Sequence, residues 1–169
     1  MNLPSYGLSV AKRMHTELVA LGASEPHNPQ TVILYDALVT NNMLRNKTEK
    51  LFKDGHHARS VEEAFKLLEN VVKDKADLSA TDLSGASLMQ KAFSGNKPIL
   101  KLNEGLSTSE KDEQLGYMSI LSGCMTGIRN PRAHESEWED TEQHALQLLV
   151  LANHLIERVL LSKKVEPEQ

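Results

Sequence analysis

Six consecutive residues in the C-terminal third of the chain, Arg129 to His134, bring two guanidinium groups and an imidazole close together. The imidazole of His134 can take and give a proton near neutral pH, because the unperturbed pKa of histidine is about 6.5. The guanidinium of Arg129 offers a fork of N–H donors to two phosphate oxygens, where negative charge builds up in a transition state. The segment therefore contains groups suited to attack on a phosphodiester.

RNA carries its own nucleophile for such a reaction, because its 2′-hydroxyl can attack the adjacent phosphate. The reaction leaves a 2′,3′-cyclic phosphate and a 5′-hydroxyl, and it needs neither a metal ion nor a covalent enzyme intermediate. It does need a base and an acid, and a single His134 in each chain is too few groups to serve as both. A symmetric dimer that places two copies of the segment side by side would supply both groups.

The same residues also have an ordinary structural interpretation. An Asn-Pro pair often follows the end of a helix, and an arginine near a helix C-terminus interacts favourably with the helix dipole. Pro131 is expected to make the backbone change course between two long helical patterns. An arginine and a histidine separated by four residues also arise by chance. From the residues alone, a catalytic site and a helix ending both stay open.

Composition limits the alternatives. The formal net charge is −4 and the pI is near 6.0, whereas a protein with a broad nucleic-acid-binding surface is usually basic. Any nucleic-acid contact must therefore come from a local cluster. Cys124 is the only cysteine, which excludes a disulfide framework or a thiolate zinc site within one chain. No two histidines near the Arg129–His134 segment are spaced for chelation on a helix, so we predict no metal and no cofactor.

We also expect a cytoplasmic protein with no membrane association. No stretch approaches the roughly 18 consecutive apolar residues of a membrane span. The N-terminus lacks the apolar core of a signal peptide.

The fold class follows from hydrophobic periodicity. Aromatic residues make up only 4% of the chain, leucine and alanine are plentiful, and strand-like alternation is nearly absent. The sequence predicts an all-α bundle of five to seven helices. The last helix is apolar on two sides, which is typical of a central bundle helix or one shared between subunits. Helices are expected over residues 5–21, 29–52 with a possible break near 40–42, 56–72, 85–93, 107–128 and 136–161.

Several landmarks together resemble a known family. The segment Arg129 to His134 resembles the Arg, four residues, His motif of the HEPN superfamily (higher eukaryotes and prokaryotes nucleotide-binding). More narrowly, the chain looks like the Ymh-type HEPN family. The landmarks occur in the family's order over residues 45–160, and they are Leu51–His57, Val61–Glu69, Leu88–Phe93 and Gly127–Glu135.

The resemblance implies an all-α domain that dimerises with its motifs facing one another across a cleft. Many HEPN proteins are metal-independent endoribonucleases, often toxins or antiviral effectors. On this pattern Arg129 and His134 are the catalytic pair, and Asn130 helps to hold the phosphate or to position His134. RNA is then the substrate, and a cognate antitoxin or a partner in a defence complex is expected.

The chain is expected to divide into three segments. Residues 1–44 are an unrecognised N-terminal helical segment, residues 45–163 are the HEPN-like helical domain, and residues 164–169 are a charged tail.

Two further residues are candidates for the site. Glu63 lies on the polar face of its predicted helix, where it can orient His134 or Arg129, or simply form an ion pair with Arg59 one turn earlier. Arg132 is the second cation of the segment and can contact phosphate. Two other functions remain open: a non-catalytic HEPN module that binds nucleotide, RNA or protein as a dimer, and a purely structural dimer unit.

Overall fold

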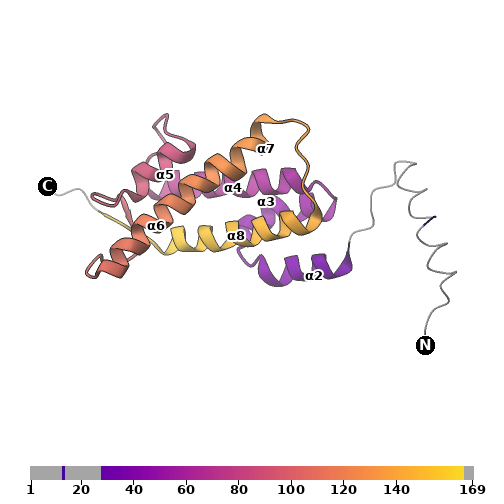
Figure 1. The fold of residues 1–169 in the computed structure, drawn as a ribbon, viewed down its shortest axis with the longest axis horizontal. Coiled ribbons are helices and arrows are strands. Elements are labelled where there is room, and N and C mark those ends of the chain that lie inside the picture. The colour runs from indigo at the N-terminus through magenta and orange to yellow at the C-terminus, as the bar shows by residue number, and fades with distance from the viewer. Residues whose placement is uncertain (1–12, 14–27, 166–169) are drawn as a thin grey trace.

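Two long helices, α4 (His57–Lys75) and α8 (Glu142–Leu161), pack along one another at the centre of the fold (Figure 1). The computed structural model describes Arg13 and residues 28–165. The helix predicted over residues 5–21 lies outside this range, apart from Arg13. Five apolar residues of α4 recur at three- and four-residue steps and are fully buried, which gives the helix one face in the core: Val61, Ala64, Phe65, Leu68 and Val72.

The remaining helices surround this pair. They are α2 (Pro29–Leu38), α3 (Asn42–Lys53), α5 (Gly85–Phe93), α6 (Thr108–Cys124), the π-helix η1 (Met125–Arg129) and α7 (Asn130–His134). The segments α6, η1 and α7 run on without a break, so the described residues contain six helices. The prediction of an all-α bundle of five to seven helices is confirmed for this part of the chain.

The helical path is interrupted between α2 and α3, near residues 40–42, where the sequence suggests a possible break. The side chain of Asn41 accepts a hydrogen bond from Leu44 N and so caps α3. The side-chain oxygen of Asn153, on α8, accepts from the backbone N–H groups of Thr40 and Asn41 at 2.9 Å each. Helix α2 also packs on α8, so the described part of the bundle includes residues that precede residue 45. The domain boundary at residue 45 stays a prediction.

The helix starts were predicted with mixed success. Ser107 and Glu110 form the capping box that their spacing predicts at the start of α6. Ser136 and Glu139 have the same spacing, but the predicted start of the last helix at residue 136 is wrong. Helix α8 begins at Glu142 because Thr141 is its N-cap, with a side chain that accepts from His144 N. Residues 135–141 therefore form a connection between α7 and α8.

A two-residue strand pair closes one end of the bundle, where the sequence predicted none. Strand β1 (Leu100–Lys101) pairs antiparallel with β2 (Lys163–Lys164) directly after α8. The pair ties the start of the predicted charged tail to the loop before α6.

The prediction that no stretch of the chain is apolar enough for a membrane span is wrong for α8 by length and composition alone. Among the described helices α8 alone is long and apolar enough to cross a membrane by length and composition. A core helix passes the same test, and many of its side chains are buried in the bundle, among them Ala145, Leu149, Ala152 and Ile156.

Candidate functional site

The Arg129–His134 segment lies inside a continuous helix, which corrects the prediction that the helix ends before it. In η1 the N–H of Asn130 donates to the carbonyl of Met125, five residues earlier. Pro131 has no N–H to donate, and in a regular α-turn its ring would clash with the carbonyl four residues before it. The wider π turn gives the ring that room, so the helix continues to His134.

Arg129 points toward α4 and meets the buried carboxylate of Glu69. Its Nη2 lies 4.0 Å from Glu69 Oε2, and its Nη1 donates to Asn130 Oδ1 at 3.1 Å. The Arg129 side chain is 23% exposed and that of Glu69 is 8% exposed. Among residues 28–165, neither Arg129 Nε nor Glu69 Oε2 has a hydrogen-bond partner. Arg129 is therefore oriented by two neighbours but keeps unused donors.

Unpartnered buried polar atoms carry a free-energy cost of about 1–3 kcal/mol each. Such an atom calls for an explanation, and a bound ligand, water or ion is one. Arg129 Nε and Glu69 Oε2 are two such atoms that lie near one another, and Ser122 Oγ and Arg158 Nε are others among the described residues.

His134, the last residue of α7, is exposed and lines an open pocket of ≈ 350 Å³. The pocket lies between the first half of α4 and the connection that follows α7. Arg129 is not among the described residues of the lining, so the two residues of the motif meet different parts of α4. The lining residues are Ala58, Arg59, Glu62, Arg132, Ala133, His134, Glu135, Ser136 and Trp138.

Arg132 is buried, and each of its three guanidinium nitrogens donates a hydrogen bond. Nε and Nη2 donate to the two carboxylate oxygens of Asp140 at 2.6 Å each, and Nη1 donates to the Ile128 carbonyl at 2.7 Å. Burial raises the pKa of Asp140, but the hydrogen bonds and charge of Arg132 outweigh it and hold that pKa below its ordinary range. Arg132 therefore fixes the connection after α7, and its contact with phosphate stays a prediction.

Glu63 forms the ion pair with Arg59 that was one of its two interpretations, at 2.8 Å, and it also lies 3.4 Å from Lys66. The carboxylate beside Arg129 is Glu69, which we did not predict. One signal was available in the sequence. Glu69 lies among leucines and valines on the buried side of α4, and a buried carboxylate requires a cationic partner.

The other reactive groups offer no competing site within the described chain. Burial raises the pKa of the Cys124 thiol to about 11, which keeps it protonated and unreactive. No group of three or more His, Cys, Asp and Glu side chains among the described residues is arranged to hold a metal ion. Catalysis without a metal nevertheless stays a prediction.

The fold and this segment define an all-α protein in which a π turn presents an arginine and a histidine from one continuous helix. The chain belongs to the family described as "Protein of unknown function (Hypoth_ymh)", whose model matches residues 40–159. No curated protein and no solved structure matches the chain.

Proposed function

We propose that the chain is a metal-independent endoribonuclease of the HEPN superfamily, with Arg129 and His134 as its catalytic pair. Arg129 stabilises the phosphate, and His134 transfers protons during attack by the 2′-hydroxyl. The observation that carries the proposal is the unequal use of the two arginines. All three guanidinium nitrogens of Arg132 donate hydrogen bonds, whereas Arg129 makes one hydrogen bond and lies beside a carboxylate oxygen that has none among the described residues. A phosphate would complete the hydrogen bonding of Arg129.

A homodimer is part of the proposal, because one His134 in each chain supplies only one proton-transfer group. Helix α6 offers a surface for the second copy. Gly116, Ile120, Gly123 and Gly127 recur at four- and three-residue steps, and Ile120 is 47% exposed.

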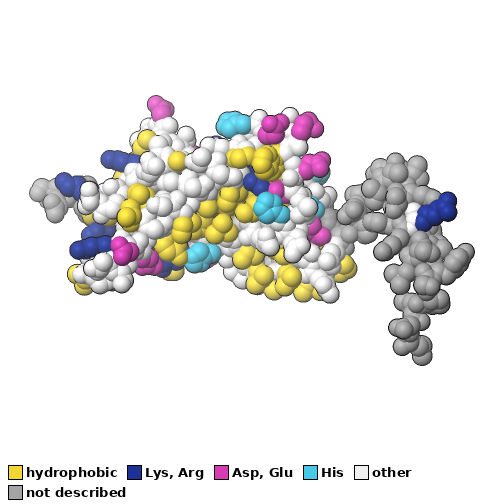
Figure 2. All heavy atoms as spheres, viewed as in Figure 1, with side chains coloured by type: hydrophobic (Ala, Val, Ile, Leu, Met, Phe, Trp, Pro, Cys, Tyr) yellow, Lys and Arg dark blue, Asp and Glu magenta, His cyan; other side chains and the backbone are white. Residues whose placement is uncertain are grey.

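The glycines of this surface are not required by the chain's own packing. A Cβ atom added at Gly116, Gly123 or Gly127 would meet nothing within 4 Å among the described residues. Hydrophobic side chains gather over α6 and α8 on the same side of the molecule (Figure 2). Small residues beside apolar ones allow close approach of a partner helix.

A non-catalytic HEPN dimer that binds nucleotide, RNA or protein is the second candidate. The specific observation in its favour is Glu69, since a carboxylate at 4.0 Å already gives Arg129 a negative partner. A guanidinium neutralised in this way binds phosphate less strongly. The net charge of −4 points in the same direction.

The family resemblance further supports a biological role as a toxin or antiviral defence effector, with an antitoxin or defence-complex partner that restrains it. The expected phenotype is growth inhibition on expression, relieved by His134→Ala.

RNA cleavage by the purified full chain in EDTA tests the catalytic proposal. We expect cleavage by the wild type and a loss of about 10²–10⁴-fold in His134→Ala, because one proton-transfer group is removed. The non-catalytic candidate instead predicts RNA or nucleotide binding with no cleavage by either form. Intact RNA together with harmless expression would overturn the catalytic proposal.

The dimer is tested by Gly123→Leu. The added side chain has open space in one chain, so the monomer should fold normally while the dimer and the cleavage are lost. Lys111→Leu is the matched control, because it adds the same side chain at an exposed position near the start of α6. Sedimentation that reports the wild type as a monomer would contradict the composite site.

A further inference from the structure

Trp138 is held as a flat platform at the edge of the His134 pocket. The guanidinium of Arg132 lies against the Trp138 ring, with Cζ 5.4 Å from the ring centroid. The Arg132 side chain is only 3% exposed and is fixed by two hydrogen bonds to Asp140. Trp138 itself is 40% exposed. Because one face of the ring is covered by a buried group, the exposure comes from its opposite face and edge.

Such a ring is suited to stacking on a nucleobase. Stacking of a base on an aromatic side chain is favourable for every base, and a ring already fixed in place loses little entropy on binding. Trp138 and His134 line the same pocket of ≈ 350 Å³, which is large enough for a base next to a phosphate at His134.

Glu62 gives the pocket a means to distinguish bases. Its side chain is 9% exposed, and its two carboxylate oxygens accept from Arg59 at 2.7 Å and from Lys66 at 2.7 Å. Each oxygen has a second lone pair, so the carboxylate can accept two further hydrogen bonds. Arg59 is 55% exposed and adds positive charge beside the pocket.

Guanine matches this carboxylate better than the other bases do. Its Watson–Crick edge carries two adjacent N–H donors, at N1 and N2, which fit the two oxygens of one carboxylate. Adenine, cytosine and uracil each place an acceptor beside their donor, and that acceptor would face a carboxylate oxygen.

We propose that the pocket beside His134 is a guanine subsite, in which Trp138 stacks on the base and Glu62 accepts hydrogen bonds from its Watson–Crick edge. The subsite rests on the proposed ribonuclease function and names its sequence preference: cleavage next to guanine. It also gives Arg132 and Asp140 a role in the site, because they hold the platform.

Trp138 is the only tryptophan of the chain, so tryptophan fluorescence reports the proposed platform alone. The probes are 3′-GMP, 3′-AMP, 3′-CMP and 3′-UMP, titrated into the full chain. We expect saturable quenching by 3′-GMP with an affinity about tenfold above that of the other three, the discrimination typical of one bidentate pair. No quenching by any of the four nucleotides, or equal affinity for all four, would overturn the subsite.

Glu62→Gln tests the role of the carboxylate. The variant should keep quenching but bring 3′-GMP to the affinity of the other nucleotides. Glu139→Gln is the matched control, because it makes the same charge change at an exposed position of the connection outside the pocket lining. An equal loss of preference in both variants would contradict direct recognition by Glu62. Trp138→Phe keeps an aromatic ring, and calorimetry should find its affinity for 3′-GMP within a few-fold of the wild type and above that of Trp138→Ala.

Failure of the subsite and failure of the ribonuclease proposal are distinguishable. Arg129 is not part of the pocket lining, so Arg129→Ala should lose cleavage and keep quenching by 3′-GMP. If the wild type cleaves RNA without preference for guanine, the subsite is wrong and the ribonuclease proposal stands. If the wild type binds 3′-GMP selectively but leaves RNA intact, the ribonuclease proposal is wrong.

Discussion

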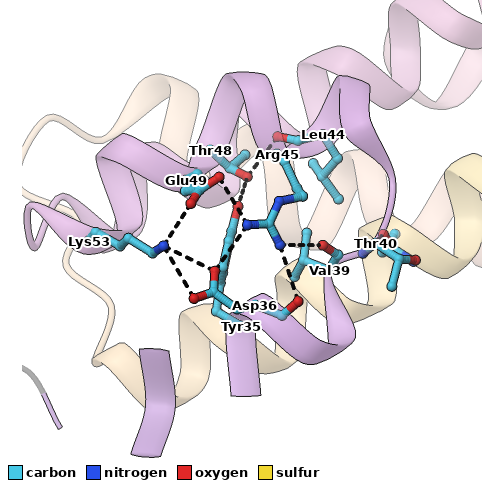
Figure 3. Close-up of polar contacts among 10 residues, drawn as sticks. Tyr35, Asp36, Val39, Thr40, Leu44, Arg45, Thr48, Glu49 and Lys53 are labelled. Atoms are coloured by element: carbon cyan, nitrogen blue, oxygen red, sulfur yellow. Dashed lines mark hydrogen bonds and ion pairs between the residues drawn. The ribbon is translucent and has the colours of Figure 1, made fainter. Parts of the chain in front are cut away.

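The charged cluster between α2 and α3 differs from the Arg129–His134 segment in how completely its polar groups are paired (Figure 3). Arg45 Nη1 donates to the carbonyls of Asp36 and Val39 at 3.2 Å, and Nη2 donates to Asp36 Oδ1 at 3.0 Å. Glu49 lies 3.2 Å from Arg45 and 2.6 Å from Lys53. The cluster joins the two helices, and each charge has a partner of opposite sign.

Arg129 contrasts with Arg45 although both side chains are about one quarter exposed, at 23% and 25%. Arg129 makes one hydrogen bond, to the neighbouring Asn130, and its Nε has no partner among the described residues. Arg132, three residues later, makes three hydrogen bonds, as Arg45 does. The contrast therefore separates two arginines that tie segments of the fold together from one that we propose binds a ligand.

Arg132→Ala should have the largest effect on stability. It leaves the buried Asp140 carboxylate without its partner, and breaking a buried pair in this way costs about 3–5 kcal/mol. Urea denaturation measures the loss. Adding Asp140→Asn should recover part of it, because the unpaired charge is then removed. A loss below about 1 kcal/mol, the usual value of a surface pair, would contradict a structural role for Arg132.

The same pair makes a prediction about pH. The folded-state pKa of Asp140 lies below its ordinary value of about 4. The contribution of ionised Asp140 to stability is therefore fully present above about pH 4 and is lost as the pH falls through the folded-state pKa. Asp140→Asn should flatten this part of the stability curve.

Arg129→Ala should separate activity from stability. Removal of a donor that stabilises transition-state charge lowers the cleavage rate by about 10²–10³-fold. Arg45→Ala is the control, because it removes a guanidinium of similar exposure from the saturated cluster. We expect Arg45→Ala to lower the midpoint of thermal unfolding and to leave the rate per folded molecule unchanged. Equal effects of Arg129→Ala and Arg45→Ala on the cleavage rate would contradict a catalytic role that belongs to Arg129 alone.

The sequence predicted the helices better than it predicted how they meet. The faces of α4 and the cap of α6 follow from local patterns: Val61, Phe65, Leu68 and Val72 repeat at helical spacing, and Ser107 and Glu110 form a capping box. These features depend on residues close in sequence. They were therefore accessible without the structure.

The course of the helix through Pro131 was not accessible in this way. Proline ends most helices, and the π turn that retains it is stabilised by packing on α4, which involves residues far apart in sequence. The same dependence on residues far apart in sequence explains why the sequence predicts Glu63, and not Glu69, as the carboxylate of the site. The helical repeat shows which side of α4 is polar, but it does not show which residue meets Arg129.

Glu69→Gln should have a moderate effect on the cleavage rate, and it tests whether Glu69 orients Arg129. The substitution removes the charge that orients Arg129, and a misplaced catalytic group lowers the cleavage rate by about tenfold or more. Stability should change little, because the ion pairs of Glu69 with Lys73 and Arg129 are long, at 3.6 and 4.0 Å, and Oε2 has no hydrogen bond within the described chain. A large loss of stability with an unchanged cleavage rate would instead favour the non-catalytic candidate.

Tyr35→Phe should have the smallest effect, within the saturated cluster. The Tyr35 hydroxyl hydrogen-bonds Thr48 Oγ1 at 2.8 Å, and removing one such bond costs about 1 kcal/mol. Burial raises the pKa of Tyr35 above its ordinary value of about 10. Wild-type stability should therefore fall as the pH rises above that value toward the folded-state pKa, and the variant should lose this decline.

End-group analysis of the RNA products tests the proposed metal-independent attack by the 2′-hydroxyl most directly. In EDTA the wild type is expected to give fragments with a 2′,3′-cyclic phosphate and a 5′-hydroxyl. A single 2′-deoxy nucleotide on the 5′ side of the scissile phosphate should block cleavage there, because the nucleophile is missing. Products with a 5′-phosphate, cleavage that requires an added metal ion, or intact RNA would contradict the account.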